Sequence, residues 1–265
     1  MNKPTSRVAI CTGGGRGLGR AMALGLVSAG YQVVITAARE GDEIAAVAAE
    51  APKRAILPLV ADVSDPKACE YVVAEAEARL GPVSVLVNNA GRGMRYVSDE
   101  FITKPTRFWE VDPAVWGMII LTNVNGPFFM TRALIPGMIA RKWGRIVNIS
   151  MNRDTMRRAG FSPYGPSKAA LESETAIWAQ DLIGTGITVN TLLPGGASNT
   201  GMIPATVPAA MRENLLQPDI MVAPLLWMIS DCAASFTGRR VNASLWTCAE
   251  NAASNPESLS EPAGC

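Results

Sequence analysis

Two residues in the second half of the chain have the types and the spacing for proton transfer. Tyr164 and Lys168 stand four positions apart at the start of a helical pattern, so both side chains fall on one face of a helix. An ammonium beside a phenol favours the phenolate and lowers a pKa that starts near ~10. Because the chain has no histidine, this pair is the best available acid–base group near neutral pH.

A glycine-rich segment near the amino end has the composition of a phosphate-binding loop. Thr12–Gly19 reads TGGGRGLG and lies between an apolar run and a helical pattern. Glycines there permit positive φ and let backbone N–H groups approach a pyrophosphate, while the helix amino end supplies partial positive charge. The spacing differs from GxGxxG, and a tight turn is the alternative. The expected contacts are Gly13, Gly15, Arg16, Gly17, Leu18 and Gly19.

The end of the second apolar run indicates which dinucleotide is bound. A carboxylate at this point binds the 2′-hydroxyl of NAD and repels a 2′-phosphate. Here the run ends with Arg39, and the first acid is Glu40. The guanidinium of Arg39, with that of Arg16, is placed to bind a 2′-phosphate, so NADP is favoured. The alternative is that both are ordinary solvated arginines.

Short apolar runs alternate with helical patterns along the chain. Runs without polar alternation suit strands buried on both faces of a parallel sheet. The seven expected strands are Arg7–Thr12, Gln32–Thr36, Ala55–Val60, Val83–Asn88, Arg145–Ile149, Ile187–Leu193 and Arg240–Leu245. The expected helices are Gly17–Ala29, Asp42–Ala49, Pro66–Leu80, about Pro113 to Trp143, Pro163–Gly184 and Pro218–Asp231.

This alternation predicts an α/β fold of the Rossmann type, a doubly wound parallel sheet with helices on both faces. We expect one domain over residues 1–246, followed by a polar tail, 247–265, in solvent. Two long segments, Arg92–Asp112 and Gly195–Gln217, follow expected strands. Ligands bind at such places, although ordinary surface loops are the alternative.

Composition excludes several other classes of protein. The formal charge is +1, which argues against nucleic-acid binding because that needs a basic face. Five scattered cysteines with no CxxC pair predict reduced thiols, with neither disulfides nor a metal site. We expect no signal peptide and no segment apolar and long enough to span a membrane, hence a cytoplasmic protein.

With these motifs in order, the chain resembles the short-chain dehydrogenase/reductase family, in its single-domain branch, over about residues 5–246. One motif alone is modest evidence, but all of them at the expected strand ends are specific. The matching motifs are Thr12–Gly19, Asp62-Val63, Asn88-Asn89-Ala90-Gly91, Asn123, the Tyr164/Lys168 pair and Pro194-Gly195.

The resemblance implies a role for each matching residue. Tyr164 would exchange a proton with the substrate oxygen, Lys168 would hold the nicotinamide ribose, and Asn123 would support a water in a proton relay. The remaining implied cofactor contacts are Asp62, Val63, Asn89, Ala90, Gly91, Pro194, Gly195 and Thr200. Asn89 and Asn123 have an alternative as loop or helix-kink residues.

One position departs from the family pattern. The family's catalytic serine normally lies thirteen residues before the tyrosine, and here that residue is Met151, which has no hydrogen to donate. Ser150 would replace it if the strand end is bulged, or Asn152 would supply an amide. A lost donor of this kind typically costs ~100- to 1,000-fold in rate.

We therefore expect an NADP-dependent oxidoreductase that interconverts a ketone and a secondary alcohol, with Tyr164 as acid and base. The alternative is a dinucleotide-binding protein without turnover, because of Met151. The segment after Gly91 is about ten residues longer than the family's, and its aromatic residues, such as Phe108 and Trp109, would shape an apolar pocket or contact a second subunit. The resemblance also implies a homo-oligomer, a tetramer or a dimer.

Overall fold

The computed structural model describes residues 7–204, 207, 209–246 and 259–264. In these residues one sheet has the strand order β3-β2-β1-β4-β5-β6-β7-β8. All pairs are parallel except β7 with β8. The strands are β1 Val8–Cys11, β2 Gln32–Ala37, β3 Ile56–Val60, β4 Val83–Asn88, β5 Gly144–Ile149, β6 Ile187–Leu193, β7 Arg239–Asn242 and β8 Ser260–Pro262.

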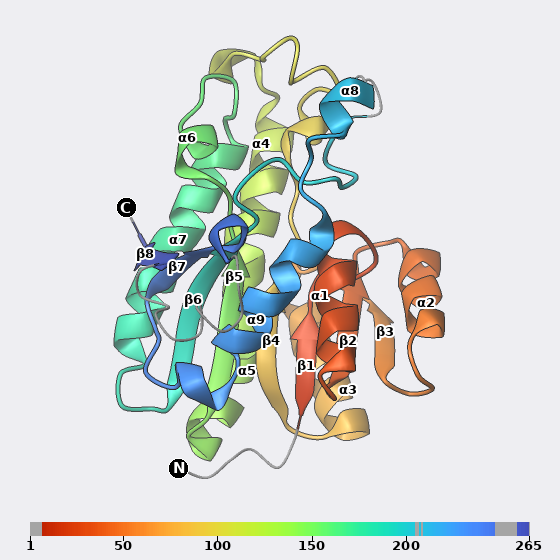
Figure 1. Cartoon of the computed structure of the whole chain (residues 1–265), viewed down its shortest axis with the longest axis vertical. Coiled ribbons are helices and arrows are strands. Elements are labelled where there is room, and N and C mark those ends of the chain that lie inside the picture. The colour runs from red at the N-terminus through yellow and green to blue at the C-terminus, as the bar shows by residue number, and fades with distance from the viewer. Residues whose placement is uncertain (1–6, 205–206, 208, 247–258, 265) are drawn as a thin grey trace.

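Helices cover both faces of this sheet (Figure 1). On one face α1, α2 and α9 enclose an apolar core that includes Met22, Val47 and Leu225. On the other face α3, α5 and α7 enclose a second core. The helices are α1 Gly17–Ser28, α2 Gly41–Glu50, α3 Pro66–Leu80, α4 Pro113–Ile120, α5 Gly126–Arg141, α6 Arg153–Met156, α7 Tyr164–Asp181, α8 Ala209–Arg212 and α9 Val222–Met228. The predicted doubly wound fold is confirmed.

The carboxyl-terminal segment corrects one expectation. The seven predicted strands all form, but Ser260–Pro262 adds an eighth within the described residues, antiparallel to β7. This part of the tail is therefore not a free extension in solvent; residues 247–258 and 265 lie outside the described residues. A three-residue strand has no apolar pattern to predict it. It is held by ladder hydrogen bonds and by Arg239, whose Nε donates to the Ser260 hydroxyl at 3.0 Å.

The long predicted helix from Pro113 is present but is not a uniform α-helix. Between α4 and α5 the turn Leu121–Asn125 has π-helical hydrogen bonding. By length and composition alone the 29 residues Pro113–Arg141 could cross a membrane, so the expectation that no such segment exists is wrong. The core helix of a globular protein passes the same test, and Met130, Leu134 and Met138 of α5 are buried against the sheet.

Polar side chains form a connected layer inside the molecule, between the central strands and α7. Asn88 of β4 donates to the Asn148 side chain of β5 at 2.9 Å, and Asn148 donates to the Thr175 hydroxyl of α7 at 2.8 Å. Thr191 of β6 donates to the same hydroxyl at 3.2 Å. These groups are buried and satisfy one another, so the layer defines how α7 lies on the sheet.

The segment after β4 packs differently from the expectation. The Phe101 ring contacts the Phe161 ring edge to face, with 5.9 Å between centroids, just before α7. Phe108 and Trp109 are 66% and 68% exposed, so they do not form an apolar pocket in this chain. Together they remain an exposed aromatic pair on the short helix η2, Phe108–Glu110.

Candidate active site

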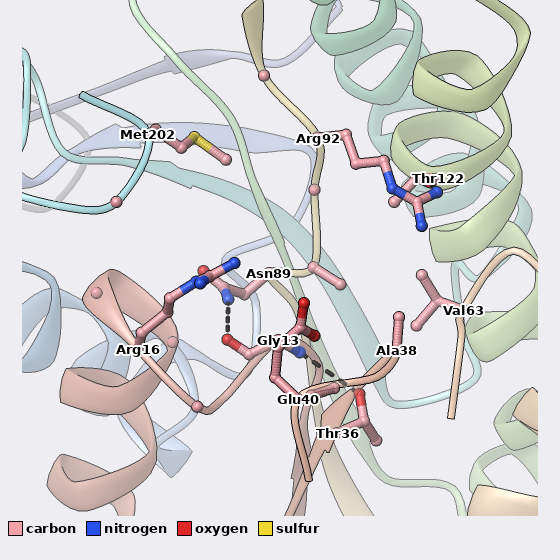
Figure 2. Close-up of a pocket in the computed structure, with 18 of the residues that line it drawn as sticks. Gly13, Arg16, Thr36, Ala38, Glu40, Val63, Asn89, Arg92, Thr122 and Met202 are labelled. Carbon is pink, nitrogen blue, oxygen red and sulfur yellow. Dashed lines mark hydrogen bonds between the residues drawn. The ribbon is translucent and has the colours of Figure 1, made fainter. Parts of the chain in front are cut away.

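A pocket of about 620 Å³ opens at the carboxyl ends of β1, β2 and β4. Parallel strands place their carboxyl ends along one edge, which is where doubly wound folds bind ligands. Figure 2 shows side chains from the first four strands' loops meeting across it. The predicted cofactor residues that line it are Gly13, Gly15, Arg16, Gly17, Leu18, Gly19, Arg39, Asp62, Val63, Asn89, Ala90, Gly91 and Thr200.

The glycine loop has the geometry of a phosphate cradle. Gly13 and Gly17 have positive φ, 65° and 53°, which other residues rarely adopt. A Cβ on Gly19 would lie 2.1 Å from the Gly13 carbonyl oxygen, so only glycine permits this close packing of helix α1 on the loop. The amino end of α1 therefore faces the pocket, and the loop fits the pyrophosphate of a dinucleotide.

Asn89 holds the glycine loop against the segment after β4. Its side-chain amide donates to the carbonyl oxygens of Thr12 and Gly13 at 2.9 and 3.0 Å, and Figure 2 shows the bond to Gly13. The Thr12 hydroxyl in turn accepts the backbone N–H groups of Asn89 and Ala90, both at 3.0 Å. The two predicted cofactor motifs thus form one hydrogen-bonded unit.

Asp62 lies on the pocket wall and is already engaged by protein groups. Its carboxylate accepts the backbone N–H and the hydroxyl of Ser64 at 2.9 and 2.7 Å, and Arg92 Nη2 at 3.2 Å. Burial works to raise its pKa, but the Ser64 hydrogen bonds and the Arg92 charge hold the pKa below its ordinary value. Arg92 also donates to the Thr122 hydroxyl, toward which it points in Figure 2.

Charges of both signs surround the place expected for the ribose. Arg39 lines the pocket and is exposed. Arg16 lies across the pocket and pairs with Glu43 at 3.1 Å. Glu40 also lines this region and is labelled in Figure 2. Two cations and two carboxylates therefore meet here.

Helix α7 carries Tyr164 and Lys168, but neither side chain lines the pocket as it stands. The Tyr164 hydroxyl donates to the sulfur of Met202 at 4.0 Å, and Lys168 Nζ donates to the Ile149 carbonyl oxygen at 2.7 Å. Burial raises the pKa of Tyr164 to about 12. The expected lowering by Lys168 is therefore absent in this arrangement, and the phenol keeps its proton at neutral pH.

Lys168 experiences two opposing effects. Burial lowers the pKa of Lys168 to about 8, and the carboxylate of Glu172 opposes this by raising it. The group is therefore close to the point of losing its charge just above neutral pH. A lysine in this state can exchange a proton in the physiological range.

Asn123 lies in the π-helical turn and joins three elements. Its amide oxygen accepts the Arg92 backbone N–H at 2.8 Å, and its amide nitrogen donates to the Arg92 carbonyl oxygen and to the Ser167 hydroxyl, both at 2.9 Å. The side chain is fully buried. Asn123 thus connects the segment after β4 to the turn of α7 that follows Tyr164.

The residues expected to replace the missing serine are occupied elsewhere. Ser150 is buried and its hydroxyl donates to Glu172 at 2.6 Å, and Asn152 donates to the Gly195 carbonyl oxygen at 2.7 Å. Met151 is itself buried. The structure therefore does not present Ser150 as a donor beside Tyr164, because α7 supplies a charged acceptor for it.

The two long segments meet above the pocket. Arg95 Nη1 donates to the Gly201 carbonyl oxygen at 2.6 Å, and Met202 lies against Gly93. Thr200 packs on Gly17 and lines the pocket, as expected. Pro194 and Gly195 do not line it; Gly195 has φ of 96° and turns the chain beside Asn242 and Ser244 instead.

Arg92 and Met202, which belong to the two long segments expected near a ligand, line the pocket. Sequence reasoning missed the buried pair Glu172–Arg240, which contacts Ser150 and Met151. One signal was available: Glu172 stands four positions after Lys168, and Arg240 is a charged residue within an expected strand. Their pairing could not be predicted from the sequence, because the two residues are 68 positions apart.

Fold and site together define a dinucleotide-binding protein of the Rossmann type with a tyrosine–lysine pair beside the cofactor cleft. The comparison with protein families then gives the particular class. Residues 7–209 match the family described as short chain dehydrogenase. The chain belongs to the short-chain dehydrogenase/reductase family and is an oxidoreductase of the class that acts on carbonyl or alcohol groups.

The curated relatives and solved structures agree with this class. The chain is 36% identical over 247 residues to an acetoacetyl-CoA reductase of Shinella zoogloeoides, covering 90% of this chain and 97% of that one. A 3-ketoacyl-(acyl-carrier-protein) reductase from Brucella melitensis complexed with NADH superposes with a TM-score of 0.79 at 29% identity, over 89% and 96% of the two chains. An actinorhodin polyketide ketoreductase with NADPH gives 0.78 at 27%, over 91% and 97%.

We predict that Asn123→Leu weakens dinucleotide binding by about tenfold or more. The change leaves the backbone N–H and carbonyl oxygen of Arg92 without their hydrogen bonds to Asn123, each at a cost of about 1–3 kcal/mol, and removes the bond to the Ser167 hydroxyl. It thereby frees the segment that holds Asn89. Titration of NADPH fluorescence measures the affinity. Asn125→Leu, two positions along the same turn, is the matched control, and an equal loss in both variants would contradict the prediction.

Proposed function

We propose that this protein is an NADP(H)-dependent reductase that converts a ketone to a secondary alcohol, with Tyr164 as the proton donor. The observation that supports it best is the arrangement around α7. Tyr164 lies under Met202, and Met202 lines the pocket with the glycine cradle, so the tyrosine stands next to the cofactor cleft. Lys168 and Asn123 approach the same segment, because Gly91 lies near both side chains.

The reaction balances with the groups available. The dinucleotide, when bound, supplies the hydride to the carbonyl carbon. Tyr164 gives its proton to the carbonyl oxygen as the general acid. Burial raises the pKa of Tyr164 to about 12, so the phenol carries this proton at neutral pH. Lys168, with a pKa of about 8, then passes a proton from solvent to Tyr164. Asn123 holds the protein segments beside this route in place through its bond to the Ser167 hydroxyl.

For substrate binding, Met202 and its segment must move from the Tyr164 hydroxyl. A carbonyl oxygen has to take the place that the sulfur now occupies, 4.0 Å from the hydroxyl oxygen. The Arg95–Gly201 hydrogen bond and the packing of Met202 on Gly93 lie at an exposed edge. Loops of this kind open readily.

We infer that the substrate is a small molecule with a ketone, and 3-oxoacyl thioesters are the first to test. The support is the similarity to reductases of acetoacetyl-CoA and of 3-oxoacyl-carrier-protein substrates. A cytoplasmic location and assembly as a dimer or tetramer belong to the same proposal. Ser150 has no part in the proposed chemistry at the substrate, because its hydroxyl is held by Glu172.

Tyr164→Phe tests the central claim. We expect at least a ~100-fold loss of NADPH-dependent reduction, since general acid catalysis contributes about that much, with NADPH affinity unchanged within about twofold. The assay follows NADPH consumption with acetoacetyl-CoA, simple diketones and quinones. Tyr71→Phe, an exposed tyrosine on α3, is the control. Turnover that survives in Tyr164→Phe would disprove the role of the phenol.

Arg39→Asp tests the choice of NADP. Reversing this charge places a carboxylate where the 2′-phosphate is proposed to bind, so the affinity for NADPH should fall at least tenfold while that for NADH changes little. Binding of both dinucleotides is measured by fluorescence. Lys53→Asp, a charge reversal in the connection between α2 and β3, is the control. Equal losses for NADPH and NADH would remove the 2′-phosphate assignment.

A second candidate function, dinucleotide binding without turnover, is favoured by Met151 and by the covered Tyr164 hydroxyl. Met151→Ser separates the two. If the chain is a reductase limited by the absent donor, a serine hydroxyl there should raise kcat about tenfold or more. Met156→Ser, a buried methionine on α6, controls for loss of packing. No turnover in wild type or in Met151→Ser, with NADPH still bound, would favour the binding protein.

A further inference from the structure

A buried ion pair lies behind the proposed active site. Arg240 of β7 donates through Nε to Glu172 Oε1 of α7 at 2.9 Å, and the two side chains are only 7% and 2% exposed. Charged residues are rarely buried to this degree unless they are paired. Glu172 stands one helical turn after Lys168, so the pair lies directly beneath the proposed catalytic lysine.

The pair is bonded to the chain that ends β5. Ser150 donates its hydroxyl to Glu172 Oε1 at 2.6 Å, and Arg240 Nη2 donates to the Met151 carbonyl oxygen at 2.7 Å. The carbonyl oxygen of Ile149 accepts Lys168 Nζ at 2.7 Å. Lys168, Glu172 and Arg240 therefore bond to three consecutive residues, Ile149–Met151.

The carboxyl-terminal strand completes this arrangement. Glu261 of β8 accepts Arg153 Nη1 at 2.6 Å, and Arg240 Nη1 lies 3.9 Å from the same carboxylate. Arg153 begins α6, in the segment that leads to Tyr164. The guanidinium of Arg240 thus lies between the carboxylates of Glu172 and Glu261 and connects the edge strand to the site.

We propose that Glu172 and Arg240 are positioning residues of the reductase site, which fix Ile149–Met151 and hold the Lys168 ammonium in place. This rests on the proposed function, because Lys168 is assigned its role there. Ser150, whose hydroxyl is bonded to Glu172, is part of the same support. An apolar pair of the same volume would pack at this place without these bonds, so packing alone does not account for the charges.

The charge of Glu172 has a measurable effect on the pKa of Lys168. Helix α7 carries the titratable residues Tyr164, Glu172 and Glu174, and α6, which packs against it, carries Arg153 and Asp154. Of the charged groups, the carboxylate of Glu172 is the one that acts on Lys168, and Arg240 of β7 is paired with that carboxylate. The negative charge of Glu172 raises the pKa of Lys168 against the effect of burial. Removing that charge therefore lowers this pKa, and Lys168 loses its proton at a lower pH.

Glu172→Gln keeps the shape and the acceptor for Ser150 but removes the charge. We expect the alkaline limb of the pH profile of kcat/KM for reduction to move down by about one pH unit, the usual scale for one nearby opposite charge. kcat at pH 8 should fall several-fold with KM within about twofold. Asp181→Asn, at the exposed carboxyl end of the same helix, is the control and should leave the profile unchanged.

Glu172→Gln also leaves Arg240 without its buried carboxylate partner, which lowers the Tm. A lower Tm therefore does not by itself separate a positioning role from a purely structural one. The double variant Glu172→Leu/Arg240→Met removes both charges and should recover most of the Tm. We expect its alkaline limb to stay displaced. A double variant with wild-type stability and a wild-type pH profile would overturn the proposal, as would an unmoved limb in Glu172→Gln.

A readout that needs no turnover separates this proposal from the proposed function. The Lys168 titration is followed in the full chain by NMR of labelled lysine side chains, with the signal assigned by Lys168→Arg. Glu172→Gln should lower its midpoint by about one pH unit even if no carbonyl is reduced. An unchanged midpoint would reject the proposal that Glu172 supports Lys168. A shifted midpoint in a protein without turnover would reject only the proposed reductase activity.

Discussion

The hydrogen bonds between Asn88, Asn148 and Thr175 are the interaction on which the site depends. Asn88 and Asn148 are paired in register at the carboxyl ends of β4 and β5, and Thr175 lies on α7. Each group is buried, so a hydrogen bond lost here is not replaced by one to bulk water. This layer fixes the rotation of α7 on the sheet, and with it the direction in which Tyr164 and Lys168 point.

From this fixed helix the site extends in two directions. Toward the pocket, Asn123 connects α7 to the segment after β4, and Asn89 connects that segment to the glycine loop. Away from the pocket, Glu172 and Arg240 connect α7 to the ends of β5 and β7. Segments distant in sequence therefore form one polar framework beside the pocket, which keeps Tyr164 and the glycine cradle in a constant relation.

Electrostatics in this framework follow burial more than the nearest charge. The sequence predicts a lowered pKa for Tyr164 from the neighbouring lysine, yet Lys168 is bonded to the Ile149 carbonyl oxygen and the phenol is desolvated. The result is a neutral phenol and a lysine of reduced pKa.

The sequence by itself determined the order of strands and helices, the glycine cradle, the cofactor-binding motifs and the tyrosine–lysine pair. These are local patterns: buried strands read as apolar runs, positive φ calls for glycine, and residues four apart share a helix face. The tertiary structure alone decided the partners of Ser150, Lys168 and Arg92, the pairing of Ser260–Pro262 at the sheet edge, and the contact of Met202 with Tyr164. Each of these depends on which residues, far apart in the chain, come within hydrogen-bond distance once the sheet has formed, and no local pattern encodes that distance.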